Sequence, residues 1–83
     1  MQIAVKRVDA KLPLPKYETN GAVGFDLIAR ETTVIAARSI GLIPGNVIIE
    51  VPAGYFLLIS LRSSTPRKKS LLIPHGVGVI DQD

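Results

Sequence analysis

Glycine, proline and β-branched residues divide this chain into short segments, and this division restricts it to a fold built from strands. No window longer than ten residues keeps apolar side chains at helical spacing without such an interruption. The segments are short apolar or alternating runs bounded by turn residues, which predict turns at 19–21, 44–46 and 52–54. They are an opening strand around Ile3 and Val5, and residues 23–29, 32–36, 40–43, 47–51, 55–61, 71–73 and 77–80. Roughly eight short strands predict an all-β barrel or jelly roll.

The composition is too apolar for a domain of this size to bury by itself. The chain has 83 residues, of which 47% are hydrophobic, and its mean hydropathy is +0.33. A chain of this length hides only about 60% of the surface that its unfolded form exposes. We therefore expect assembly with other copies, or apolar faces meant for further strands.

Cysteine is absent, which excludes disulfides, thiolate metal sites and cysteine nucleophiles. The longest apolar run, residues 55–59, is far shorter than the ~20 residues of a membrane span. A cytoplasmic location with no membrane partner is the expectation. The formal charge is +3, and four cations lie within one short segment, namely Arg62, Arg67, Lys68 and Lys69. Such a local patch favours an anionic partner.

Two clusters combine charge with small residues. Asp26 lies in the apolar run 22–29, where it either faces solvent by strand alternation or is kept for a chemical role, because burying an unpaired charge is costly. A second cluster joins Arg62 to the hydroxyls of Ser63 and Ser64 in a polar loop after a strand. These donors suit phosphate oxygens, and a solvated basic loop is the alternative.

The third cluster follows Pro74. Gly76 and Gly78 weaken a strand and often mark a close approach to the backbone. Asp81 and Asp83 stand at positions i and i+2, so a strand would carry them on one face, where two acids can share a metal, activate water or simply solvate an edge. His75 is the only histidine. A single histidine of this kind is more often a hydrogen-bonded loop residue than a metal ligand or a catalytic base.

Several common kinds of catalytic and nucleotide-binding motif are not supported by the sequence. A triad of Ser63, His75 and Asp81 lacks the nucleophile-elbow pattern, and no Walker loop or dinucleotide-binding fingerprint is present. Mg²⁺, held by carboxylates together with a substrate's phosphates, is the remaining metal expectation. Nucleic acid is not expected as a partner, because the aromatic residues are scattered instead of lying beside the basic segment.

In this order the three clusters resemble the motifs of the trimeric dUTPase family, hydrolases that cut dUTP to dUMP and pyrophosphate. Residues 24–29 (Gly-Phe-Asp-Leu-Ile-Ala) are similar to its first motif, residues 54–64 to its second, and residues 78–83 (Gly-Val-Ile-Asp-Gln-Asp) to its third. The resemblance covers essentially the whole chain. It implies a dUTPase-like distorted β-barrel or jelly roll, dUTP or a related pyrimidine deoxynucleotide as substrate, Mg²⁺ as cofactor, and a homotrimer whose sites combine neighbouring subunits.

The resemblance also implies roles for particular residues. Asp81 would orient and deprotonate the attacking water and contact the sugar 3′-hydroxyl. Arg62, Ser63 and Ser64 would hold phosphate oxygens and the leaving pyrophosphate. Asp26 would assist Mg²⁺ indirectly, through the water shell of the ion.

Recognition of the base is implied for a separate set of residues. The backbone of Gly78, Val79 and Ile80 would read the uracil edge. His75 stands where family members often carry an asparagine that contacts the base. The chain also departs from the family pattern at Leu61, usually proline, and at Ser64 and Ser70, where glycine is common.

Two alternatives remain open beside dUTP hydrolysis. The related dCTP deaminases share the fold and carry Arg-Ser-Ser, as this chain does at 62–64. A non-catalytic nucleotide-binding or subunit-interaction module is the other. We expect residues 1–83 to form a single domain that stops after the third motif, before an aromatic residue and two further motifs of the family. For that reason we expect the 83-residue chain by itself to be weakly active or inactive.

Overall fold

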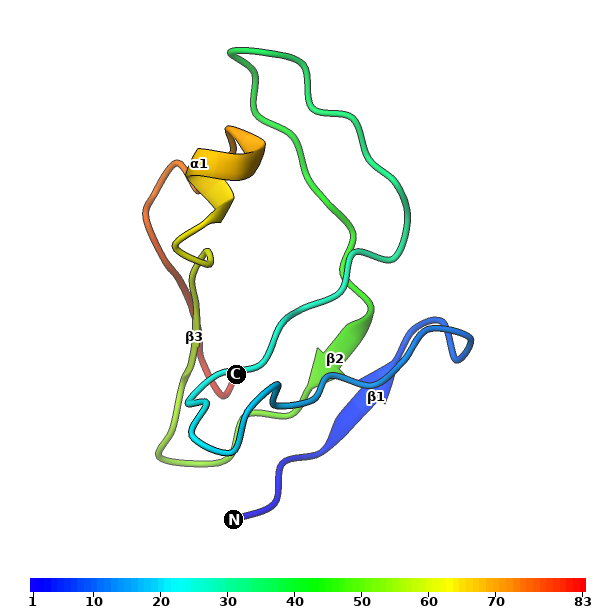
Figure 1. Cartoon of the computed structure of the whole chain (residues 1–83). Coiled ribbons are helices and arrows are strands. Elements are labelled where there is room, and N and C mark those ends of the chain that lie inside the picture. The colour runs from blue at the N-terminus through cyan, green and yellow to red at the C-terminus, as the bar shows by residue number, and fades with distance from the viewer. The chain divides into compact units, whose positions relative to one another are not determined.

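The computed structural model describes residues 1–83 and consists of short strands, one short helix and long connections (Figure 1). The elements are β1 (Val5–Arg7), β2 (Val47–Ile49), β3 (Leu57–Ile59), α1 (Thr65–Lys69) and β4 (Gly78–Ile80). β1 pairs with β2 and β3 pairs with β4, both antiparallel, and neither two-stranded sheet closes into a barrel. The predicted all-β class is confirmed. No helix has the length and apolar character that crossing a membrane requires.

The chain divides into two compact units that are described separately. One unit is Val5–Ile49, and the other joins Met1–Ala4 to Glu50–Asp83. In the second unit the N-terminal segment is held by a hydrogen bond from the Glu50 N–H to the Ala4 carbonyl oxygen, at 3.0 Å.

In the unit Val5–Ile49 the β1–β2 ladder shows the alternation expected of strands. The register pairs Val5 with Ile49 and Arg7 with Val47, and all four of these side chains are half-buried. The central pair of the ladder, Lys6 and Ile48, is exposed. One face of the ladder is therefore sheltered and the other faces solvent.

Asn46, just before β2, is the only fully buried side chain of the chain. Its amide group bonds the backbone of Asp9 twice: the Asp9 N–H donates to Oδ1 at 2.8 Å, and Nδ2 donates to the Asp9 carbonyl oxygen at 3.1 Å. The Val8 N–H donates to the Asn46 carbonyl oxygen at 2.9 Å. The loop after β1 is thus fixed to the start of β2 by polar contacts.

Residues 30–44 form a long excursion, drawn in cyan to green in Figure 1. Its base is closed by the bridge between Ala29 and Gly45 and by a 2.8 Å hydrogen bond from the Arg30 N–H to the Pro44 carbonyl oxygen. A turn from Ala36 to Ser39 lies at its far end, with a bond of 3.2 Å.

Several strands predicted from the sequence are absent. Residues 23–29 contribute only the Ala29 bridge, and residues 32–36, 40–43 and 71–73 form no ladder. Most apolar side chains of the excursion stay exposed, with Leu42 91% exposed, and only Ile35 among its large aliphatic residues is half-buried. A two-stranded ribbon is only marginally stable without a layer that covers it. No such layer covers residues 32–36 and 40–43 within their unit. The prediction of roughly eight strands is therefore wrong for this chain.

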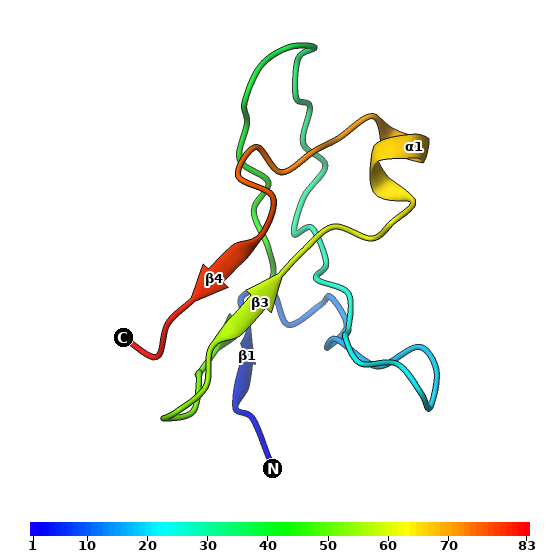
Figure 2. The same ribbon diagram turned by 90° about the vertical axis from the view of Figure 1, so that its left-hand side faces the viewer.

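In the unit that contains Glu50–Asp83, β3 and β4 lie side by side and run in opposite directions (Figure 2). The register pairs Leu57 with Ile80 and Ile59 with Gly78. The predicted turn at 52–54 precedes β3 and is closed by a bond from the Tyr55 N–H to the Pro52 carbonyl oxygen at 3.1 Å. Gly54 has φ +84° there, the left-handed value that a type II turn requires at its third residue.

The helix α1 is a correction to the predicted polar loop. Its first turn contains Pro66, whose fixed φ suits that position, and its last turn is basic, which complements the negative C-terminal end of the helix. The Lys68 N–H bonds the Ser64 carbonyl oxygen at 2.8 Å, and the Ser70 N–H bonds the Pro66 carbonyl oxygen at 3.0 Å. Periodicity could not reveal a helix of five residues.

No apolar side chain is buried anywhere in the chain. The accessible surface is 7250 Å², whereas a folded monomer of this mass exposes about 4,800 Å². The excess apolar surface that the composition predicted is therefore present in the structure.

Candidate functional site

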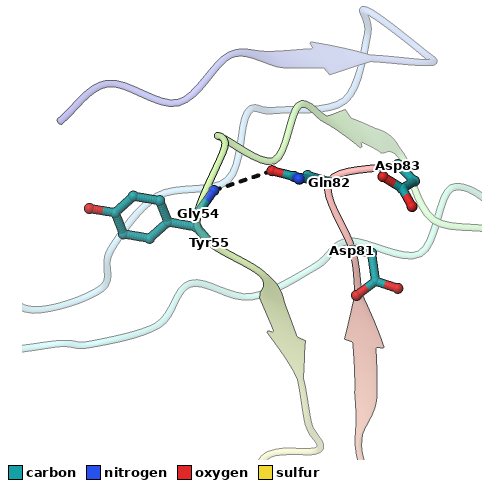
Figure 3. Close-up of a pocket in the computed structure, with 5 residues that line it drawn as sticks. All are labelled: Gly54, Tyr55, Asp81, Gln82 and Asp83. Carbon is teal, nitrogen blue, oxygen red and sulfur yellow. Dashed lines mark hydrogen bonds between the residues drawn. The ribbon is translucent and has the colours of Figure 1, made fainter.

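Asp81 lies directly after the last residue of β4, at the end where the β3–β4 ladder opens. An open pocket of about 260 Å³ lies there, lined by Gly54, Tyr55, Asp81, Gln82 and Asp83 (Figure 3). The turn before β3 supplies one wall and the residues after β4 supply the other. The Asp81 carboxylate is exposed and makes no hydrogen bond or ion pair, so it is accessible to a water or a ligand.

One hydrogen bond crosses this pocket. The Gly54 N–H donates to Oε1 of Gln82 at 3.2 Å (Figure 3). In the same view the Gln82 side chain points toward Gly54, whereas the side chains of Asp81 and Asp83 point away from it, and the Tyr55 ring points away from all three. Both acids lie beyond β4, which ends at Ile80, so no strand carries them on one face.

The predicted phosphate-binding residues lie at the other end of the same ladder. Arg62, Ser63 and Ser64 follow β3 and lead into α1. Arg62 and Ser63 are exposed and Ser64 is half-buried. The Thr65 N–H donates to the Arg62 carbonyl oxygen at 3.0 Å, which folds this segment back toward the helix. None of the three lines the Asp81 pocket.

The predicted base-reading residues are in β4 and in the turn before it. Gly76 has φ +87°, and its N–H donates to the Ile73 carbonyl oxygen at 3.0 Å, so the exposed His75 sits in a tight turn. A Cβ on Gly78 would lie 3.4 Å from the Cβ of Ile59. The close approach expected at Gly78 is thus made here by the neighbouring strand.

Val79 and Ile80 complete β4 and are both exposed. Because β3 and β4 are antiparallel, the Arg62–Ser64 segment and His75 leave one end of the ladder while Asp81 leaves the other. The structure therefore brings Asp81 together with Gly54, Tyr55, Gln82 and Asp83. The predicted phosphate contacts and His75 lie at the other end of the ladder, whereas β4 spans the length between the two ends.

Asp26 lies in the other unit, Val5–Ile49. It is exposed between the half-buried Phe25 and Ile28, with Leu27 also exposed. The Phe25 ring packs edge-on against Tyr17, with ring centroids 5.7 Å apart, which anchors the segment that carries Asp26. The chain assembles no group of three or more histidine or acidic side chains that could hold a metal ion.

Sequence reasoning missed Gln82 as a member of the site. The signal was available in principle, because an antiparallel continuation of β3 and β4 sets residues 54–56, which begin in the turn, opposite residues 81–83. The register itself could not be read from the sequence, and without it nothing linked Gln82 to Gly54.

Comparison with known proteins identifies relatives along the whole chain. The family model described as dUTPase matches residues 10–83. A deoxyuridine 5′-triphosphate nucleotidohydrolase of Lactococcus lactis is 39% identical over 82 residues, which cover 99% of this chain and 55% of that protein. The protein of the same name from Helicobacter pylori strain J99 is 31% identical, covering 100% of this chain and 57% of the relative.

A further protein of that name, from Thermobifida fusca, is 30% identical over 98% of this chain and 45% of its own length. No solved structure matches the chain. The chain spans about half the length of the curated relatives that it matches. The family match over residues 10–83, together with relatives that align along nearly all of the sequence, shows that this chain belongs to the dUTPase family.

Proposed function

We propose that this chain belongs to a dUTP diphosphatase, which hydrolyses dUTP to dUMP and pyrophosphate. The observation that carries the proposal is the accessible Asp81 carboxylate in an open pocket at the end of β4, in a chain of the dUTPase family. All three relatives described above bear a name that states this hydrolysis. Because the chain spans about half of their length, we expect weak or no turnover from it alone.

In the proposed reaction Asp81 orients a water and takes its proton as that water attacks the α-phosphorus in line with the leaving pyrophosphate. A positioned carboxylate is suited to this role when it is deprotonated and open to the substrate. Arg62, Ser63 and Ser64 bind phosphate oxygens and the leaving pyrophosphate through the guanidinium and hydroxyl groups.

Recognition of the nucleotide base is proposed for β4 and the turn before it. The backbone groups of Gly78, Val79 and Ile80 would bond the uracil edge, since rigid backbone groups give orientation and specificity. The exposed His75 in the adjoining turn would contact the same edge.

Members of this family generally depend on a metal ion, and we propose Mg²⁺ for this protein. An ion that keeps several waters and binds mainly through substrate phosphates needs only one or two protein carboxylates. The exposed Asp26 fits that requirement, acting through the water shell. Neutralisation of the triphosphate charge is the chemistry that Mg²⁺ supplies when bound.

We further propose that residues 1–83 lie within a single domain of a cytoplasmic homotrimer. The continuous family match supports a single domain. The placement of Asp81 and the Arg62–Ser64 segment at opposite ends of one ladder supports a site that combines neighbouring subunits. The abundant exposed apolar side chains supply surface for such an assembly.

Binding and turnover of dUTP by the purified chain test the proposed function. With Mg²⁺ present, we expect dUTP to raise the melting temperature saturably, and Arg62→Gln to raise the dUTP concentration needed by about ten-fold. Lys16→Gln, which removes one exposed cation from the other unit, is the matched control and should change nothing. Any pyrophosphate release should fall about 100-fold or more in Asp81→Asn, because a general base contributes that much.

Product analysis separates the alternatives. Ammonia released from dCTP would indicate a deaminase, an outcome that the Arg-Ser-Ser sequence at 62–64 makes worth measuring. Stabilisation by dUTP without any turnover, in this chain and in trimer-forming conditions, would indicate a binding module. Absence of any saturable effect of dUTP would contradict the proposed function.

A further inference from the structure

The Gln82 side chain continues the β3–β4 ladder beyond the last paired residues. The paired register ends with Leu57 opposite Ile80, and its extension would set Asp83 opposite Gly54. Backbone pairing does not extend that far. Here the Gly54 N–H donates to Oε1 of Gln82 at 3.2 Å. The two chain segments therefore separate around the pocket while remaining tied at this point.

The point to which Gln82 is tied is itself fixed. Gly54 occupies the left-handed position of the 52–55 turn, with φ +84°, and the turn is closed by the Tyr55 N–H on the Pro52 carbonyl oxygen at 3.1 Å. A tight turn of this kind has few alternative backbone conformations. A contact with Gly54 thus restrains Gln82 against a rigid partner.

Asp81 depends on this restraint because nothing else holds it. It follows the last paired residue of β4, and its carboxylate has no hydrogen bond or ion pair. Gln82 is the next residue, and its side chain points to the opposite side of the chain from that of Asp81 (Figure 3). Fixing the Gln82 side chain therefore fixes the peptide between them and the direction in which the Asp81 carboxylate projects.

We propose that Gln82 is a positioning residue for Asp81: its amide oxygen, bonded to the Gly54 N–H, holds the open end of the β3–β4 ladder and so fixes the direction in which the Asp81 carboxylate projects beside the pocket. This inference rests on the proposed function, in which Asp81 takes the proton of the attacking water. Gln82 itself touches no reacting atom in this scheme.

The test compares three variants of the full chain. Gln82→Met keeps the length of the side chain and removes the oxygen acceptor. Gln82→Glu restores an acceptor of the same reach. Gln2→Met makes the same chemical change at the other glutamine of the sequence, which is exposed and makes no hydrogen bond.

Two readouts by NMR do not depend on turnover. In Gln82→Met we expect the Gly54 amide hydrogen to exchange about 3- to 10-fold faster, the range that one ordinary hydrogen bond supports, and the side-chain carboxyl ¹³C resonance of Asp81 to move. Gln82→Glu and Gln2→Met should leave the Gly54 exchange rate within two-fold of the original. Unchanged Gly54 exchange and an unchanged Asp81 resonance in Gln82→Met would overturn the proposal.

The kinetic constants for dUTP test whether Gln82 affects the proposed reaction. Wherever dUTP turnover is measurable, Gln82→Met should lower kcat about 5- to 20-fold with KM within two-fold, and Gln82→Glu should restore kcat, as expected for loss and recovery of orientation. An equal fall in both Gln82 variants would overturn the positioning role. If dUTP has no saturable effect on the chain, the proposed function fails, while the NMR readouts still decide whether Gln82 orients Asp81.

Discussion

Asn46 is a polar residue at the most sheltered position of the chain. Its amide forms both a donated and an accepted hydrogen bond with the Asp9 backbone, so the polar group is satisfied where water cannot reach it. Asp9 in turn accepts from the Lys11 N–H through Oδ1 at 2.9 Å. This small network fixes the loop that links β1 to the rest of its unit.

Asn46→Ala should therefore destabilise the chain by about 1–3 kcal/mol, because it removes two hydrogen bonds and leaves part-buried backbone groups of Asp9 unpaired. Urea unfolding measures the change. Asn20→Ala, at an exposed turn, is the matched control and should stay within about 0.5 kcal/mol of the original. Equal losses at the two asparagines would show that the buried network contributes nothing.

The left-handed backbone at Gly54 gives a second prediction at the residue scale. A Cβ there would meet no atom within 4 Å, so the cost of Gly54→Ala is conformational and not steric. We expect a loss of about 1 kcal/mol. Gly21→Ala also has open space and no left-handed φ, and should be neutral or stabilising by up to about 1 kcal/mol. Thermal unfolding of the pair checks the contrast in sign.

At the scale of elements, α1 explains one departure from the family pattern. Ser70 ends this helix in the left-handed conformation, with φ 54° and ψ 36°. Glycine adopts that conformation without strain and is the usual residue after a helix. The glycine that is common here in the family therefore has a conformational reason, and serine keeps the same backbone at a cost.

Ser70→Gly should consequently stabilise the chain by about 0.5–1 kcal/mol, the difference between the strain relieved and the entropy that glycine loses on folding. Ser60→Gly, at an exposed position without left-handed backbone, should destabilise by about 0.5–1 kcal/mol. Denaturant unfolding compares them. Changes of the same sign in both variants would argue against strain at Ser70.

Local sequence pattern predicts only some of the strands correctly. The segments 5–7, 47–49, 57–59 and 78–80 fall within or next to predicted strands and do pair. Segments 32–36 and 40–43 carry equally good strand patterns and do not pair as strands. The difference is not in their residues, because β-branched side chains favour a strand only when a neighbour and a covering layer are supplied.

At the scale of the whole molecule, stability should depend on assembly, because the chain buries no apolar side chain by itself. A compact domain of this length unfolds with a heat-capacity change of about 1.0–1.2 kcal/mol/K. We expect a clearly smaller value at low concentration, and a melting temperature that rises with protein concentration as copies associate. Calorimetry across a concentration series, with sedimentation for the oligomeric state, measures both. A full-sized heat-capacity change with a concentration-independent melting temperature would contradict this.

The sequence by itself determined the all-β class, the turns at 19–22 and 52–55, the excess of apolar surface and the family, because these depend on local conformational preference, composition and motif order. Only the tertiary structure decided which strands pair, that Asn46 is buried, that α1 follows the Arg62–Ser64 segment, and that Gln82 reaches Gly54 beside Asp81. The physical reason is register. A strand pattern fixes which side chains share a face, but which residues stand opposite one another depends on pairing between segments distant in the sequence.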